Sequence, residues 1–320
     1  MRLLKLVPDN TNIGFVRLRY WAFGLTLLLT IAAATLVGVR GLNLGVDFVG
    51  GVLIEANFKQ APSLDTLRAE VDRLEVGEAN LQEFGAKTVV LIRLPMPKST
   101  DEGATNRLVR TVEDDLAAKY PGVAFNRAET VSGKVSGELV RNGMLAVFLA
   151  VFGIAVFSWL RYEWQFGVST FVAIAHDLLV TLGFFALTQL EFDLNIVAAI
   201  LTIIGYSIND KIVIDDRIRE NMRKYRQMDM RALIDLSVNE TLPRTVMTSL
   251  TVLLALGALL LFGGPVLRGF TAAMMLGVIV GTYSSIYVSS SLLISLGLEP
   301  KAPSAKAAPK GPQSGAERIR

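Results

Sequence analysis

The 320-residue chain contains no cysteine and only one histidine. It can therefore form no disulfide and no cysteine-based metal site, and one chain cannot surround a metal with several histidines. It also lacks a glycine-rich loop ending in Lys-Ser or Lys-Thr, the motif that holds nucleotide phosphates. These absences argue against a nucleotide-driven pump and an ordinary hydrolase. We expect the chain to have no enzyme activity, no cofactor and no metal.

Charge is also scarce. Charged residues make up 19% of the sequence and the net charge is +3, whereas an average soluble protein has about 25% charged residues. No basic stripe is present that would indicate nucleic-acid binding. Apolar residues make up 52% of the chain and the mean hydropathy is +0.45, which indicates a membrane protein.

Long apolar runs alternate with charged blocks, and each run is long enough to cross the hydrocarbon core of a bilayer as a helix. The predicted spans are 20–39, 143–160, 166–187, 194–214, 246–262 and 270–296. A signal peptide cleaved near the alanines at 32–34 is the alternative for the first run. Because that run continues to Val39, we favour an uncleaved first span.

Residues 40–142 contain no span and carry mixed charge. Their patterns predict strands at 52–58, 80–84, 88–94 and 123–131, and helices after Ser63 and at 105–120. The order strand, helix, strand, strand, helix, strand is typical of a ferredoxin-like α+β domain. The predicted fold class is therefore a membrane all-α bundle of six transmembrane helices with one ferredoxin-like α+β domain after the first helix.

The distribution of Lys and Arg predicts the orientation, because basic residues are enriched in cytoplasmic loops. Six spans place four segments on one side of the membrane: 1–19, the turn at Arg161, the loop 215–244 and a disordered tail at 297–320, with four, one, seven and five basic residues. In the short turns on the other side, only Arg268 is basic. We therefore expect both termini in the cytoplasm and the domain at 40–142 on the periplasmic side.

Asp210 is the first candidate for chemistry, because it lies in the fourth apolar run. An ionised Asp at the bilayer centre costs roughly 2.5–3.5 kcal/mol, so such residues usually face the protein interior and mark an ion path. The alternative is that the span ends near Gly205 and leaves Asp210 in the interface. On a helix Arg217 shares a face with Asp210 and could reach it, while Lys211 and Asp215 lie four residues apart and can pair.

Two further groups of polar residues lie within apolar runs. His176 and Asp177, near the middle of the third span, can form a proton relay or a hydrogen-bonded pair that locks helix packing. Arg244 enters the fifth span, either as a counter-ion for Asp210 or as an anchor that reaches the membrane surface.

The sixth span carries small residues at four-residue spacing, which allows helix backbones to approach closely. We assign these residues to helix packing, without chemistry: Ala273, Gly277, Gly281, Ser285 and Ser289.

Several motifs resemble those of the SecD/SecF protein-export family, which is related to the resistance-nodulation-division (RND) transporters. The segment 45–51, Gly-Val-Asp-Phe-Val-Gly-Gly, resembles the family's GxDFxGG signature through Gly45, Asp47, Phe48, Gly50 and Gly51. Segments 175–177, 205–210, 216–221 and 242–245 resemble motifs of the SecF branch, in that branch's order. The similarity covers nearly the whole chain apart from the tail.

The resemblance implies a subunit of a SecD–SecF complex in the bacterial inner membrane, which assists the SecYEG translocon by using the proton-motive force. The implied partners are SecD, SecYEG, other accessory translocon subunits, the translocating preprotein and membrane lipid. It also implies that Asp210, beside Asn209 in its motif, and Arg244 take part in proton transport. Lys211 and Asp215 depart from the family pattern, which has a small residue and an aromatic there.

Two alternatives to a proton-coupled subunit remain. The chain could be an assembly subunit without its own proton path, in which case neutral replacement of Asp210 would leave activity intact. It could also be half of an RND-type small-molecule exporter, which its single small outer domain does not favour.

Overall fold

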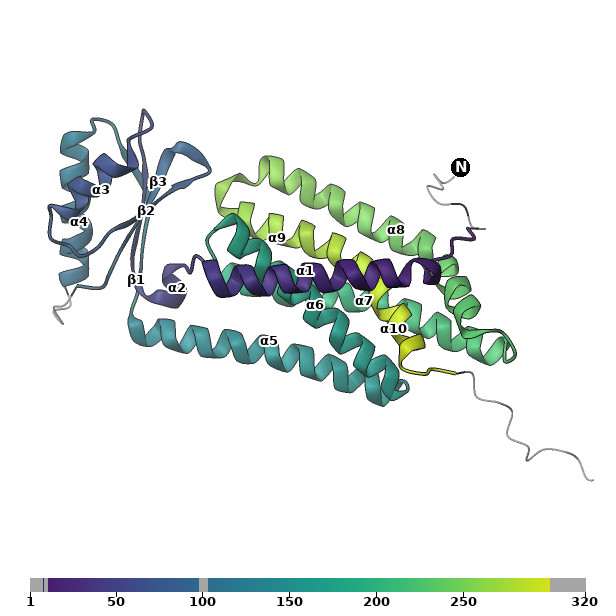
Figure 1. Cartoon of the computed structure of the whole chain (residues 1–320). Coiled ribbons are helices and arrows are strands. Elements are labelled where there is room, and N and C mark those ends of the chain that lie inside the picture. The colour runs from purple at the N-terminus through teal and green to yellow at the C-terminus, as the bar shows by residue number, and fades with distance from the viewer. Residues whose placement is uncertain (1–7, 9–10, 98–102, 300–320) are drawn as a thin grey trace, which may run out of the picture.

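The protein consists of a long helical bundle with a smaller α+β domain at one end (Figure 1). The structure is a computed structural model that describes residues 8, 11–97 and 103–299. Six helical segments of this part are long and apolar enough to cross a membrane. They are α1 (Arg19–Arg40), α5 (Gly133–Arg161), α6 (Trp164–Thr188), α7 (Leu194–Lys224), α8 (Met230–Phe262) and a last segment made of α9 (Gly264–Tyr283), η2 (Ser284–Ser289) and α10 (Ser290–Ser295).

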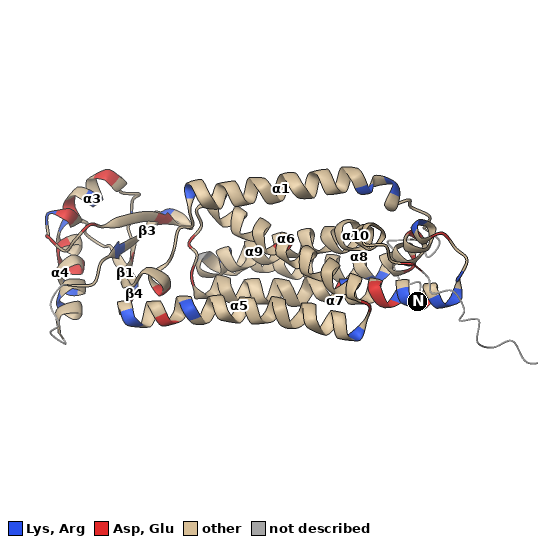
Figure 2. Cartoon of the chain, turned by 60° about the horizontal axis from the view of Figure 1, so that its bottom comes forward, with Lys and Arg blue, Asp and Glu red and all other residues tan. Residues whose placement is uncertain are grey.

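The long apolar runs form helices because a helix satisfies its backbone hydrogen bonds internally, which the interior of a bilayer requires. Charged residues gather at the two ends of the bundle, and the middle stretches of α1 and α5 carry none (Figure 2). Helices α6 and α7 lie at the centre, with half of their most apolar windows buried, whereas α1 and α5 are largely exposed. The exposed apolar residues in the middle of α1 and α5 are suited to contact with lipid.

Several helices extend beyond the predicted spans. Helix α5 begins at Gly133 rather than 143, because the Ser132 hydroxyl accepts the N–H of Val135 and caps it. The predicted loop at 215–244 is mostly helical, since α7 runs to Lys224 and α8 starts at Met230 after the cap residue Asp229. Hydropathy alone cannot find these ends, because a helix can continue into water with charged residues. The predicted disordered tail and most of segment 1–10 lie outside the described residues.

The α+β domain has the predicted element order. It contains β1 (Gly51–Asn57), α3 (Leu64–Asp72), β2 (Asn80–Phe84), β3 (Ala86–Leu94), α4 (Ala104–Lys119) and β4 (Ala124–Val131). The strands pair antiparallel in the order β2-β3-β1-β4, as in a ferredoxin-like fold. One face packs on α3 and α4, where Ile54 of β1 meets Leu67, Val71 and Leu116. The predicted fold class is confirmed.

A short segment containing helix α2 (Val46–Val49) joins the bundle to the domain. Its backbone pairs with the α6–α7 loop, because Gly45 N–H donates to Phe192 O at 2.9 Å and Phe192 N–H donates to Asn43 O at 2.8 Å. Gly51 has φ 131°, and a Cβ there would collide with the Leu94 carbonyl. The chain can therefore turn into β1 only with glycine at this position.

The last membrane segment departs from a regular α-helix. Glycines of α9 approach α7 closely: a Cβ on Gly277 would overlap Ile203, and one on Gly281 would lie 3.1 Å from Ser207 Cβ. The packing role predicted for these glycines agrees with the structure. Beyond them, Ser284–Ser289 form a π-helix, which carries an extra residue in its turn and often occurs at functional sites.

Candidate functional site

A buried carboxylate lies at the centre of the bundle. Asp177 on α6 is 2% exposed, and its Oδ2 accepts hydrogen bonds from the hydroxyls of Ser207 on α7 at 2.7 Å and Ser284 at 2.9 Å. Its Oδ1 has no hydrogen-bond partner among the described residues. One carboxyl oxygen is thus held by two helices, and the other is available to a proton.

His176, the neighbour of Asp177, faces the first helix. Its Nδ1 lies 2.9 Å from Thr30 Oγ1, and that hydroxyl donates to the Thr26 carbonyl at 2.8 Å. Because the hydroxyl has one hydrogen, this arrangement assigns the proton of His176 to Nδ1. Nε2 is then the acceptor, and no described residue binds it. His176 and Asp177 therefore bind different helices and do not hydrogen-bond to each other.

Asp210 is buried in the bundle rather than placed at its surface. It lies on α7 one turn after Ser207, is 2% exposed, and has no hydrogen bond to Oδ2 within the described chain. Arg244 on α8 is the cation whose charge acts on it. The described residues show no direct hydrogen bond or ion pair between these two side chains. The Arg244 charge acts on Asp210 without direct contact, and the counter-ion role of Arg244 stays a prediction.

Two of the predicted residues lie on the surface of the isolated chain. Asn209 and Arg244 are exposed, although each lies near the middle of its helix. With a rise of about 1.5 Å per residue, Asp210 lies about 24 Å along α7 from Leu194, and Arg244 about 27 Å along α8 from Phe262. The two residues therefore lie at similar depth in the bundle.

Arg217 does not take the predicted role beside Asp210. Its guanidinium binds Glu240 on α8 at 2.7 Å and Glu220 at 2.6 Å. Asn221 also donates to Glu240 at 2.7 Å. Shared helix periodicity suggested contact with Asp210, but Arg217 lies nearly two turns further along α7, where the acids of α8 are closer. Arg217 therefore connects α7 to α8 through an ion pair. We do not include it in the candidate proton path.

A second buried charged centre was predicted only in part. Lys211 and Asp215, each 2% exposed at the side chain, form an ion pair with Nζ 2.9 Å from Oδ2, which confirms the predicted pairing. Lys211 Nζ also donates to the hydroxyls of Ser169 on α6, at 3.0 Å, and Ser289. Ser289 was assigned to packing, so that part of the assignment is wrong: it is a polar ligand of the ammonium group.

The π-helix at Ser284–Ser289 contacts both the Asp177 carboxylate and the Lys211–Asp215 ion pair. Ser284 donates to Asp177, Ser289 accepts from Lys211, and Ser285 donates to the Ser207 carbonyl at 3.4 Å. In a regular α-helix, residues five apart point in clearly different directions, whereas the wider turn brings them closer to one face. In the sequence, the five serines within residues 284–291 could have indicated these contacts.

The helices that carry the buried acids are also attached to the α+β domain. Arg93 of β3 lies 3.2 Å from Glu191 in the α6–α7 loop and donates to Asn43 Oδ1 at 2.8 Å. Asp47 Oδ2 accepts the backbone N–H of Leu194, the first residue of α7, at 2.9 Å. Burial raises the pKa of Glu191, and the Arg93 charge opposes this shift. Asp47, predicted as a motif residue, thus joins the domain to α7.

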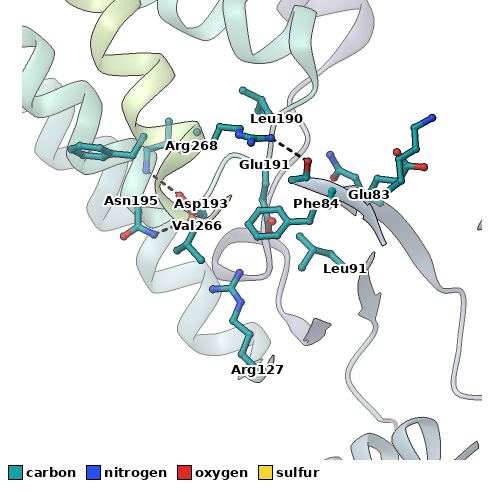
Figure 3. Close-up of a pocket in the computed structure, with 17 residues that line it drawn as sticks. Glu83, Phe84, Leu91, Arg127, Leu190, Glu191, Asp193, Asn195, Val266 and Arg268 are labelled. Atoms are coloured by element: carbon teal, nitrogen blue, oxygen red, sulfur yellow. Dashed lines mark hydrogen bonds between the residues drawn. The ribbon is translucent and has the colours of Figure 1, made fainter. Parts of the chain in front are cut away.

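A cavity of about 420 Å³ lies at this junction (Figure 3). Arg127 of β4 and Arg268, near the start of α9, lie on two sides of it, and Arg268 donates to the Gly85 carbonyl at 3.3 Å. Glu191 and Asp193 complete a lining of mixed charge. Within the described ranges, no three acidic or histidine side chains gather as metal ligands would.

The fold and these contacts define a class: a polytopic membrane protein with buried carboxyl groups between its helices and one ferredoxin-like domain. The profile described as "Protein export membrane protein SecD/SecF, C-terminal" matches residues 111–299, and that of the SecD/SecF GG motif matches 35–62. The latter includes Gly45, Asp47, Phe48, Gly50 and Gly51.

Similar proteins share nearly the full length. The chain is 44% identical over 306 residues to protein translocase subunit SecF of Cereibacter sphaeroides, covering 92% of this chain and 93% of that protein. It is 38% identical to SecF of Rickettsia rickettsii, covering 91% and 94%. The chain therefore belongs to the SecF proteins of the SecD/SecF family, which makes it a membrane transport protein and not an enzyme.

The fold agrees with a solved relative. The crystal structure of SecDF from Thermus thermophilus, described as a translocon-associated membrane protein, superposes with a TM-score of 0.82 at 36% identity. A super-membrane-facing form of SecDF gives a TM-score of 0.66 at the same identity. The match covers 91% of this chain but only 39% of the first solved chain, so the present chain corresponds to a part of it.

Proposed function

We propose that this chain works as the SecF subunit of a SecD–SecF complex in the bacterial inner membrane. There it uses the proton-motive force to assist SecYEG-dependent protein translocation. The observation that carries the proposal is the buried Asp210, which has an unpartnered carboxyl oxygen and only a through-space cation, Arg244. An acid held in this way inside a membrane bundle can change its charge by binding a proton.

The proton path runs through the polar contacts between α6 and α7. Asp177 offers one free oxygen, and Ser207 links it to the helix turn that carries Asp210. His176 offers Nε2 as a further acceptor. One elementary charge moving through about 100 mV releases about 2.3 kcal/mol. That energy is enough to shift a two-state equilibrium by more than a factor of ten.

The α6–α7 loop transmits this change to the α+β domain. Asp47 binds the first residue of α7, and Arg93 binds Glu191 in the same loop. A shift of α7 against α6 that follows protonation would therefore move the base of the domain. In this proposal the domain lies on the periplasmic side, where a moving domain can act on a preprotein.

The exposed polar face of α7 supports SecD as the partner within the membrane. Thr202, Gly205 and Asn209 form an exposed stripe at helical spacing, and Arg244 of α8 is also exposed. An arginine that faces lipid has an insertion cost of roughly 2.5–3.5 kcal/mol or must extend to the membrane surface, so a polar protein surface would stabilise this face. A second helical subunit would provide it.

The basic residues support the proposed topology, with both termini in the cytoplasm. Arg217, Arg219, Arg223 and Lys224 end α7 at the bundle end remote from the α+β domain. We propose SecYEG, its accessory subunits, the preprotein and lipid as further partners. We also retain residues 40–142 as the periplasmic domain and 215–244 as the cytoplasmic connection.

The test uses inverted membrane vesicles that contain the complete SecD–SecF complex. Asp210→Asn should abolish proton flux and proton-dependent stimulation of export while the complex still assembles, and Arg244→Met should do the same. Asp216→Asn is the matched control, because Asp216 lies on the same helix but is exposed, and its Oδ1 accepts the Tyr162 hydroxyl as an amide oxygen also can. Normal proton-stimulated export by Asp210→Asn would leave the chain as an assembly subunit.

A further inference from the structure

The ammonium group of Lys211 lies in a cage of oxygen atoms inside the bundle. Ser169 Oγ lies 3.0 Å from Nζ, Ser289 Oγ accepts a second hydrogen bond, and the Asp215 carboxylate completes the cage. Oδ1 of Asp215 accepts a hydrogen bond at 3.3 Å, while Oδ2 makes the closer ionic contact at 2.9 Å without hydrogen-bond geometry. Three helical segments, α6, α7 and η2, supply these atoms.

This set of ligands has the chemistry of a site for a small hard cation. Hydroxyl and carboxylate oxygens are the ligands that such ions prefer. The single negative charge of the carboxylate balances one positive charge. Among the described residues, Asp215 is the only acid in contact with the Lys211 ammonium, although the charge of the neighbouring Asp216 also acts on Asp215. Asp210 acts with Arg244 from another face of α7, and Asp216 is exposed and bonded to Tyr162. Within the described chain, Asp215 is therefore the one carboxylate that balances the ammonium charge by direct contact.

We propose that the cage of Ser169, Ser289 and Asp215 is a monovalent cation site that the chain fills with its own Lys211 ammonium. The cation is tethered to α7 and cannot be exchanged, so the site holds α6, α7 and η2 together without an ion from solution. A consequence, which rests on the proposed function, is that Lys211 makes coupling independent of Na⁺. The proton at Asp210 is then the only ion exchanged.

Removal of the lysine side chain should convert the occupied cage into a site that takes an ion from solution. Lys211→Ala leaves the oxygen ligands in place and opens room for Na⁺. Lys211→Met, of similar length, fills the room with an uncharged chain and blocks it. The double variant Lys211→Ala/Asp215→Asn opens the room but removes the charge that would hold the ion.

The experiment measures the melting temperature of the purified full chain in detergent, in NaCl and in choline chloride at equal ionic strength. NaCl should raise the melting temperature of Lys211→Ala by several degrees with a saturable concentration dependence, because a ligand of the folded state stabilises it. The wild type, Lys211→Met and the double variant should show no such difference. An equal response in the alanine and double variants, or none in the alanine variant, would overturn the proposal.

A ligand that can rescue folding and an export assay complete the test. If Lys211→Ala does not fold, it is purified with ethylammonium chloride, whose ammonium group can occupy the cage, and Lys211→Ser is tested in parallel. Failure of both variants to fold with Na⁺ or ethylammonium would also overturn the proposal. In vesicles, export by the wild type should not change when choline replaces Na⁺, whereas Lys211→Ala should require Na⁺. Loss of all proton stimulation in the wild type would refute the proposed function but leave the melting result standing.

Discussion

The carboxylate of Asp47 accepts the backbone N–H of Leu194 at 2.9 Å. This contact links the segment that follows the first membrane helix to the start of α7, the helix that carries Asp210 and Lys211. Helix α7 already has a cap of its own, because Asp193 Oδ1 accepts the N–H of Ile196 at 3.0 Å. Two carboxylates therefore satisfy free N–H groups at one helix start, and one of them comes from the joint with the α+β domain.

We predict that Asp47→Ala will lower the free energy of unfolding by about 1 kcal/mol, as the loss of a helix cap usually does. The same variant should increase hydrogen exchange at the Leu194 amide. Asp65→Ala is the control, since the Asp65 side chain on α3 is 96% exposed. Unchanged exchange at Leu194 in Asp47→Ala would show that this contact does not hold the start of α7.

Asp177→Asn should separate the two roles that the sequence left open for this residue. The asparagine oxygen can still accept the hydroxyls of Ser207 and Ser284, so helix packing should be kept, but the side chain can no longer bind a proton. We expect a melting temperature close to that of the wild type, together with loss of proton flux in vesicles.

Ser207→Ala is the companion variant for that measurement. It removes one hydrogen bond to Asp177 but keeps the carboxyl group, so we expect reduced rather than abolished flux. Normal flux in Asp177→Asn would assign Asp177 to packing and leave Asp210 as the single proton carrier.

The sequence was sufficient for the features that depend on local periodicity and order. Apolar runs predicted six membrane-crossing segments, and the strand and helix order predicted the ferredoxin-like domain. The spacing of four between Lys211 and Asp215 predicted their ion pair, because residues four apart are neighbours on any α-helix.

Contacts between distant segments could not be predicted in this way. Arg217 pairs with Glu240 on another helix, and Ser289, which contacts Lys211, lies in a π-helix whose wider turn changes the direction of its side chains. A four-residue stripe assumes a regular α-helix, so it correctly predicts close packing at Gly277 and fails at Ser289. The partner of His176, Thr30, lies on a helix 146 residues away in sequence.

Gly277 and Gly257 provide a matched pair of glycines for testing the packing of α9 on α7. A Cβ on Gly277 would overlap the Ile203 side chain, whereas one on Gly257 of α8 has no atom within 4 Å. We expect Gly277→Ala to destabilise the bundle by about 1–3 kcal/mol, the usual cost of overpacking. Gly257→Ala should be neutral or slightly stabilising, because alanine favours the helix. Equal unfolding midpoints for the two variants would contradict close packing at Gly277.

The burial of Glu191 beside Arg93, between the α6–α7 loop and the α+β domain, predicts a pH dependence of stability. Burial raises the pKa of Glu191 above its ordinary value, and the nearby Arg93 charge only partly opposes this. The folded chain therefore holds the proton of Glu191 to higher pH than the unfolded chain does. The stability contributed by this group is complete below its unfolded pKa and is lost as pH rises through its folded pKa.

Glu191→Gln should remove this part of the pH dependence, because a glutamine does not titrate. We expect the melting temperature of the wild type in detergent to fall relative to that of Glu191→Gln as pH rises above about 4.5. Glu83→Gln is the control: Glu83 lines the same cavity from β2 but is exposed, and its variant should follow the wild-type profile. If the difference between Glu191→Gln and the wild type changes in the opposite direction with pH, the Arg93 charge dominates over burial at this site. The joint would then be held most strongly by the ionised pair.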